Sequence, residues 1–185
     1  MAEEMRVVFS SGFESLFSKE LRKRVTPALE AELAALGVRL DKPFQAGYPI
    51  ETWAAVVDAL ASHLYPDDSR PEACKKIGCS TIIGFCDTLI GKALFPLLRL
   101  IGPVRALDRA ARNYAATNNY TKVTLSRVGP TSFDFYLNEK HTLPEFDMGV
   151  LEEALRQLHV ASPSVTLRSQ DAEGFTMRLE WAAPG

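Results

Sequence analysis

The spacing of apolar residues changes near residue 118, and this change constrains the fold more than any other feature of the sequence. Before it, apolar residues recur every three or four positions, as between Phe13 and Leu36, which is the period of a buried helix face. After it, the segments 120–127 and 133–137 alternate between apolar and polar residues, which is typical of half-buried strands. The chain is therefore expected to be helical first and to form a sheet afterwards.

A Gly-Pro-Thr turn joins the two alternating segments into a predicted hairpin. A helix is expected over 147–159, and the segments 164–168 and 175–181 form a second predicted hairpin. The prediction is an α+β fold in which an N-terminal helical region packs on a C-terminal hairpin–helix–hairpin with a four-stranded antiparallel sheet. At 185 residues we expect a single domain, 1–185, with a helical part at about 1–117 and a β-α-β part at about 118–182.

Proline and glycine divide the helical part. Thr26-Pro27 has the form of a cap followed by a first-turn proline, which predicts two helices over 13–24 and 26–36. The other predicted elements before the long central helix and after it are an edge strand over 6–9, an irregular segment over 38–48, and helices over 49–64 and 104–116.

The central helix is expected to run from Pro71 to about Leu100. Pro96 has no amide hydrogen to donate, so the sequence predicts a kink or break near 94–95. Glycines recur along this segment at spacings of six and seven residues, where they either let a neighbouring backbone approach closely or mark a bend. They are Gly78, Gly84 and Gly91.

Composition excludes several classes of protein. The chain is 46% hydrophobic and 24% charged, with a formal net charge of −2, which is typical of a globular protein and not of a general nucleic-acid binder. The apolar stretch 93–101 is too short and too charged to span a bilayer, and the acidic start of the sequence does not resemble a secretory signal. A cytoplasmic protein without membrane insertion is expected.

The reactive residues do not form a catalytic motif. Cys79 and Cys86 lie seven residues apart and would share a helix face. They provide a reactive thiol or an acylation point inside a pocket or, more simply, are small core residues. With Cys74 they form an odd set without metal-ligand spacing, so no metal site is expected. Because no nucleophile elbow, phosphate loop or metalloprotease helix occurs, we expect a protein that is not an enzyme.

Two other groups of residues could either bind a ligand or have an ordinary structural role. His63, near the end of an apolar helix, could be a haem ligand, or it could interact favourably with the helix dipole. Arg105, Arg109 and Arg112 share one helix face, which suits an anion or, more plainly, is a solvated face.

The order and spacing of several short motifs resemble a paralogous family of myxobacterial single-domain proteins of unknown function. The resemblance extends from about Phe9 to Trp181. The motifs that carry it are Tyr48-Pro49, His63-Leu64-Tyr65-Pro66, Glu72 to Gly78, Thr88 to Ala93, Gly102-Pro103-Val104-Arg105 and Leu179-Glu180-Trp181.

That family in turn is distantly similar to haem nitric-oxide-binding domains, to vinyl-reductase-like domains and to transport-particle subunits that hold an acyl chain. The resemblance implies helices packed on a hairpin–helix–hairpin sheet, with a pocket for an apolar or haem-like ligand between them. The chain lacks the Tyr-x-Ser-x-Arg propionate motif of the haem group and the cysteine-rich hairpins of the vinyl-reductase-like group. These differences argue against haem by that route and against a metal in the hairpins.

The function predicted from these observations is a regulatory or sensory signalling module, whose cofactor is unassigned and whose pocket holds a small apolar molecule between the 71–100 helix and the sheet. An acidic head group on that molecule would meet Arg105 or Arg109. The residues predicted to line the pocket are Phe85, Cys86, Leu89, Phe95, Tyr114 and Phe133.

The alternative is a structural interaction scaffold, a homodimer or a subunit of a larger complex, with a filled core and no ligand. The two differ in whether a pocket of about 300 Å³ or more lies between helices and sheet.

Overall fold

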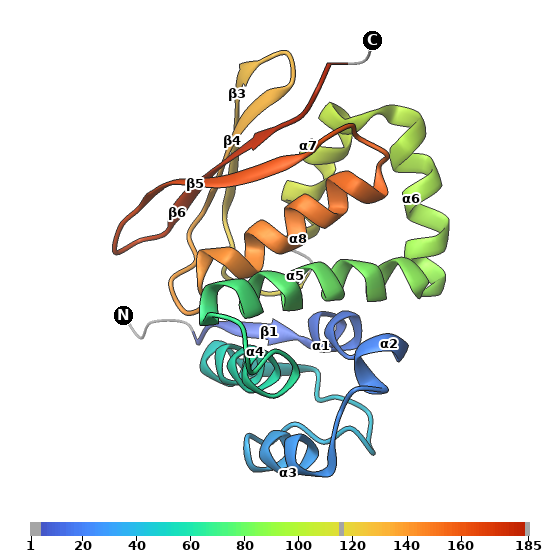
Figure 1. The fold of residues 1–185 in the computed structure, drawn as a ribbon, viewed down its shortest axis with the longest axis vertical. Helices are drawn as coiled ribbons and strands as arrows, with labels where there is room; N and C mark the ends of the chain where they lie inside the picture. Colours follow the sequence, from blue (N-terminus) through green and yellow to red (C-terminus); the bar gives the residue numbers. More distant parts are fainter. Residues whose placement is uncertain (1–4, 115–116, 184–185) are drawn as a thin grey trace.

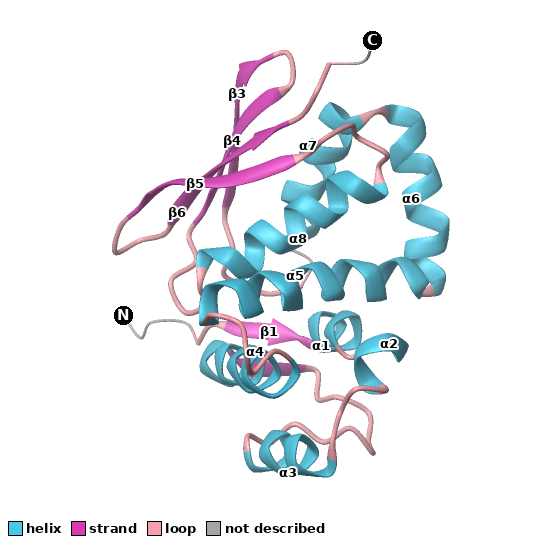
Figure 2. Cartoon of the chain, viewed as in Figure 1, coloured by secondary structure: helices cyan, strands magenta, loops and turns pink. Residues whose placement is uncertain are grey.

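The structure, a computed structural model, describes residues 5–114 and 117–183. It has the predicted α+β fold, with an N-terminal helical region and a C-terminal hairpin–helix–hairpin (Figures 1 and 2). The elements in chain order are β1 (Val7–Phe9), α1 (Ser10–Leu16), α2 (Lys19–Arg22), α3 (Pro27–Ala35), β2 (Gly47–Pro49), α4 (Ile50–Leu64), α5 (Arg70–Asp87), α6 (Leu89–Ile101), α7 (Pro103–Tyr114), β3 (Val123–Gly129), β4 (Ser132–Leu137), α8 (Pro144–Gln157), β5 (Ser164–Gln170) and β6 (Phe175–Glu180).

The four-stranded antiparallel sheet has the strand order β3-β4-β6-β5, so the second strands of both hairpins pair at its centre. Alternation along β4 and β6 places their apolar residues on one face, where Phe135 pairs with Met177. Leu151 and Leu155 of α8 belong to the same buried cluster, together with Leu107 of α7. The sheet therefore buries one face against helices.

A second apolar core holds the N-terminal helices together. Its centre is an aromatic group in which Phe13 of α1 meets Trp53 of α4 edge to face, with ring centroids 5.1 Å apart. Trp53 in turn meets Phe146, at the start of α8, at 5.8 Å. Phe146 therefore joins the C-terminal half to the N-terminal core.

Helices α5 and α8 cross at a pair of glycines. A Cβ atom added to Gly78 would lie 2.0 Å from the carbonyl oxygen of Phe146, and one added to Gly149 would lie 2.1 Å from that of Lys75. The Cys79 thiol donates to the Gly149 carbonyl at 3.4 Å, and Lys75 pairs with Glu152 of α8 at 2.7 Å. The close approach predicted for Gly78 is confirmed, and its partner is α8.

The central helix does not bend at its proline. It breaks at Thr88, which has an extended backbone and whose hydroxyl donates to the Phe85 carbonyl at 2.7 Å and accepts from the Gly91 amide at 3.0 Å. Thr88 therefore ends α5 and begins α6, and the two helices make an angle of 97°. Pro96 lies inside α6 on an exposed side, where water can satisfy the carbonyl it leaves free. In the described part of the chain no single helix is long and apolar enough to cross a membrane, although α5 and α6 pass that test together as a bent pair.

Three other predictions differ from the structure. The helix expected over 13–24 is two short helices, because the backbone leaves helical geometry at Phe17. The segment 38–48 includes the start of β2, which pairs with β1 and which the sequence analysis missed because three residues are too few to show alternation. The helix predicted over 104–116 is observed from Pro103 to Tyr114, and Ala116 lies outside the described residues.

Replacing Gly149 with alanine should destabilise the fold, although alanine is the better helix former. The added methyl group would meet the Lys75 carbonyl and force α5 and α8 apart, at a cost of about 1–3 kcal/mol in the free energy of unfolding. Urea denaturation followed by circular dichroism measures this change. Gly129→Ala is the control, because its Cβ would meet only Ser132, at 3.5 Å, and should change stability by no more than about 0.5 kcal/mol. Unchanged stability of Gly149→Ala would contradict the crossing.

Candidate ligand cavity

A cavity of about 410 Å³ lies between the helices and the sheet. This volume is in the range of pockets that hold small molecules. Most of its wall is apolar and comes from four helices, α5 to α8, with further residues from β1, α1, α4 and the segment before β3. The apolar residues that the four helices contribute are Ile82, Phe85, Ile90, Leu94, Phe95, Leu98, Ala106, Leu107, Ala110, Phe146, Val150, Leu151, Ala154 and Leu155, and Leu158 follows directly after α8.

The corner at Thr88 creates this space. Because α6 turns away from α5 by 97°, it does not pack along α5, and its inner residues Phe95 and Leu98 face a volume that α7 and α8 close from other sides. The ribbon shows α5, α6 and α8 as three sides of this frame (Figure 1). A straight helix to Leu100 would leave no such frame.

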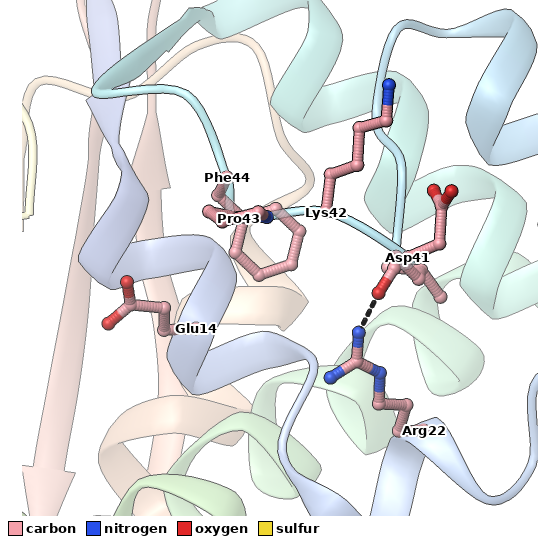
Figure 3. Close-up of a pocket in the computed structure, with 7 residues that line it drawn as sticks. Glu14, Arg22, Asp41, Lys42, Pro43 and Phe44 are labelled. Carbon is pink, nitrogen blue, oxygen red and sulfur yellow. Dashed lines mark hydrogen bonds between the residues drawn. The ribbon is translucent and has the colours of Figure 1, made fainter.

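A second cavity, of about 430 Å³, lies at the surface beside α1 and α2 and has a different character. It is lined by Glu14, Arg22, Lys42 and their neighbours, several of which are exposed, and Arg22 donates to the backbone carbonyl of Leu40 across it (Figure 3). Asp41 is paired with Arg39 at 2.8 Å. This cavity is open to solvent and carries both acidic and basic groups, so it does not favour one class of ligand.

One end of the interior cavity carries the carboxyl group of Asp147. Only 5% of this residue is exposed, and its Oδ1 accepts from the Tyr114 hydroxyl at 3.2 Å. Burial raises the pKa of Asp147 to about 8, and repulsion by the nearby Glu139 carboxylate acts in the same direction. Burial and the Asp147 carboxyl also raise the pKa of Tyr114 well above its usual value. Asp147 is therefore mostly protonated at neutral pH, and its carboxyl group can both donate and accept a hydrogen bond.

Glu139 lies at the same end and is already satisfied. Its Oε2 accepts from the Tyr120 hydroxyl at 2.8 Å, and its Oε1 accepts from the backbone amides of Lys140 and His141 at 2.8 and 2.6 Å. Burial, followed by the charge of Glu139, raises the pKa of Tyr120. These contacts hold a carboxylate in the cavity wall.

The polar end of the cavity is therefore acidic. None of the lining residues in the described part of the chain is Lys, Arg or His. A bound anion would face Asp147 and Glu139 without a compensating charge, whereas a neutral donor or a cation would be favoured.

The structure brings three of the predicted pocket residues together. Phe85, Phe95 and Tyr114 line the cavity, from α5, α6 and α7 respectively, and the rings of Phe85 and Phe95 are 6.4 Å apart. These three were predicted from the apolar character of the helices.

The other three residues predicted to line the pocket do not line the cavity. Leu89 lies just past the Thr88 corner and is 89% exposed, because the change in helix direction turns it outward. Phe133 is buried in the sheet core, stacked on Trp181 with ring centroids 5.4 Å apart. Cys86 is half-buried near the end of α5, where burial raises the pKa of its thiol to about 11 and leaves it unreactive.

The predicted anion contacts and haem ligand also lie elsewhere. Arg105, Arg109 and Arg112 are exposed on the side of α7 opposite the cavity and do not line it. His63 Nε2 contacts Glu32 Oε2 at 2.8 Å, between α4 and α3, and is not part of the cavity wall. The three arginines share one face of α7, and the apolar residues of that helix that line the cavity lie on the other face.

Sequence analysis missed Asp147, Glu139 and Tyr120. A signal for Asp147 was present, because it shares a helix face with Leu151, Ala154 and Leu158, and an acidic residue on an apolar face is unusual. Glu139 and Tyr120 lie in connections without a period, so only the fold shows that they meet.

Comparison with solved structures places the fold with H-NOX domains. One match comes from work on "the function of heme distortion in the H-NOX family", with a TM-score of 0.68 at 13% identity, over 95% of this chain and 96% of that one. An oxygen-binding H-NOX domain related to soluble guanylate cyclases matches with a TM-score of 0.64 at 13% identity, over 94% and 93% of the two chains. An Fe(II) unliganded H-NOX mutant from K. algicida matches with 0.64 at 9% identity, over 95% and 97%. These likenesses establish an H-NOX-like α+β fold.

The chain belongs to the family described as "Protein of unknown function (DUF2378)", whose model matches residues 6–182. The comparison with curated proteins finds no match. The predicted resemblance to a family of unknown function, and the likeness of the fold to haem nitric-oxide-binding domains, are thereby confirmed, and the myxobacterial origin stays a prediction.

The buried Asp147 should make the stability of the protein depend on pH. Its pKa of about 8 in the folded state exceeds the value of about 3.9 expected in the unfolded chain, so the folded protein holds a proton that the unfolded chain has lost. The free energy of unfolding should therefore fall as the pH rises from about 4 to about 8, by up to about 1.4 kcal/mol per pH unit from this residue.

Asp147→Asn should remove this contribution while keeping an acceptor for Tyr114. Urea denaturation of both proteins at about pH 5 and about pH 9 measures it, and the variant should gain stability relative to the wild type at the higher pH. Parallel pH profiles for the two proteins would show that Asp147 titrates normally.

Proposed function

We propose that the two parts of this chain form a single sensory module, without catalytic activity, that binds a small and largely apolar molecule in the interior cavity. The observation that carries this proposal is the cavity itself, about 410 Å³ of apolar-walled space between α5, α6, α7 and α8. A structural scaffold would be expected to fill such a volume, because empty apolar space lowers stability in proportion to its size.

The apolar wall would supply most of the binding energy. Removing apolar ligand surface from water contributes about 25 cal/mol per Å². Phe85 and Phe95 offer flat aromatic surfaces, whereas Ala110 and Ala154 leave room for the ligand's chain or ring. This arrangement favours a hydrocarbon-like body over a sugar or a nucleotide.

The acidic end would select the head group. Asp147 has one oxygen bonded to Tyr114, and its protonated carboxyl can donate to an alcohol or carbonyl or give up its proton to an amine. A carboxylate or phosphate would instead be repelled by the Glu139 carboxylate, without a Lys, Arg or His in the described lining to compensate its charge. The ligand class that fits is an apolar alcohol, ketone or amine.

Haem, which is named in the description of one of the similar structures, does not fit this cavity. The described lining contains no histidine, cysteine or methionine to ligate iron, and its two tyrosine hydroxyls, from Tyr114 and Tyr120, are both bonded to carboxyl groups. The described lining also contains no Lys, Arg or His to pair with the propionates. We therefore propose a binding role of another chemistry on an H-NOX-like fold.

A ligand in this position would couple the two parts of the chain. The cavity wall includes Trp53 of the N-terminal core and Leu151 and Leu155 of the sheet core, so one molecule would contact both. Occupancy would stabilise the arrangement of α6 and α7 seen here, which is the change that a partner could detect.

A series of probes with one chain and three head groups tests the proposal. 1-Octanol, octylamine and octanoate should be titrated against the full chain by isothermal calorimetry. We expect 1-octanol and octylamine to bind at a single site and octanoate to bind at least tenfold more weakly. Failure of all three to bind would overturn the proposal, and stronger binding of octanoate would overturn the head-group assignment.

Ala154→Phe should abolish binding of both favoured probes by filling the cavity with its ring. Ala31→Phe on the exposed face of α3 is the matched control and should bind as the wild type does. Circular dichroism confirms that each variant is folded. Equal binding by both variants would place the probes outside this cavity.

A further inference from the structure

The outer side of α6 is the most exposed apolar surface on the described part of the chain. Leu89 and Leu100 are 89% and 87% exposed, and Ile90 and Leu97 are more than half exposed. With exposed Ala93 they fall within about 100° of the helix circumference, at 100° per residue. We call these five residues the α6 outer face.

This face has no partner because of where α6 lies in the fold. The helix stands at the edge of the molecule, joined to α5 at one end and to α7 at the other (Figure 1). Its opposite side, with Phe95 and Leu98, is buried towards the cavity. Ile90, at one edge of this face, also lines the cavity, whereas Leu89, Leu97 and Leu100 do not and are not needed for the core. Isolated exposed residues are common on protein surfaces, but four large apolar side chains on one side of one helix form a patch.

The charges around the face are positive. Lys92 and Arg99 are exposed along one border of it, and α6 contains no acidic residue. Beyond Gly102, α7 adds exposed Arg105, Arg109 and Arg112, with Asp108 among them. The nearest acid before α6 is the exposed Asp87. An apolar strip bordered by cations is the pattern of a helix that lies in the interface of an anionic membrane.

We propose that the α6 outer face docks on the surface of a bilayer that contains anionic lipids. The helix has 13 residues and is about 20 Å long, too short to span a bilayer, so it would lie in the plane of the head groups. Its leucines would enter the acyl boundary while Lys92, at the border of the same helix face, meets a lipid phosphate. A second copy of the chain fits less well, because two such faces would bring Lys92 and Arg99 of both copies together without an acid to pair them.

This docking does not depend on a ligand in the cavity, so the two proposals can fail separately. The full chain should be sedimented with vesicles of phosphatidylcholine alone and with vesicles that mix phosphatidylcholine and phosphatidylglycerol. We expect binding to the mixed vesicles, at least tenfold weaker binding to pure phosphatidylcholine, and weakening as salt is added.

The double variant Leu89→Gln/Leu100→Gln should lose at least tenfold in affinity for the mixed vesicles, and Lys92→Gln should lose severalfold. Both leucines are exposed, so these changes leave the core intact. The matched control is Val128→Gln/Leu167→Gln, at exposed apolar positions on β3 and β5, which should bind as the wild type does.

Absence of binding to mixed vesicles, or equal binding by the α6 double variant, overturns the proposal. A concentration-dependent dimer in sedimentation velocity that the α6 double variant abolishes, without vesicle binding, would assign the face to a second copy and also overturns it.

Discussion

The close approach of α5 and α8 at Gly78 and Gly149 is the constraint on which the rest of the structure depends. The two positions let α5 and α8 cross with backbone against backbone, since a Cβ at either would lie 2.0–2.1 Å from a carbonyl oxygen. α5 belongs to the N-terminal core and α8 to the sheet core, so this crossing fixes how the halves meet. It also sets the position of Asp147, two residues before Gly149 on α8, against Tyr114 of α7.

The cavity results from two local features of the structure. Close packing of α5 on α8 brings the layers together, and the Thr88 corner then directs α6 away, so that α6 and α7 form a wall around space that they do not fill. The same corner turns one side of α6 inward and the other outward. The cavity and the exposed apolar face therefore have one structural origin, although the two proposed functions are independent.

The sequence predicted the fold well because its signals are local and periodic. The alternation along β4 and β6 and the helical spacing in α4 and α8 fixed the element types and their buried faces. The site was only partly predictable. Phe85, Phe95 and Tyr114 follow from apolar helix faces, but Leu89 depends on a corner made by one threonine hydroxyl, and sequence reasoning placed the break at Pro96. At the acidic end, Asp147 on α8 lies near Glu139 in the connection between β4 and α8. The spacing of residues in the sequence does not indicate that these two side chains are close.

Native mass spectrometry of the full chain, purified without added ligand and accompanied by an absorption spectrum, tests the central claim most directly. The account predicts one small apolar molecule per chain, an alcohol, ketone or amine by its fragmentation, and no Soret band. Haem at one per chain, or a bound fatty acid, would contradict the assignment of an acidic cavity. A bare chain, under conditions that preserve the complex of the same protein with octylamine, would contradict a resident ligand.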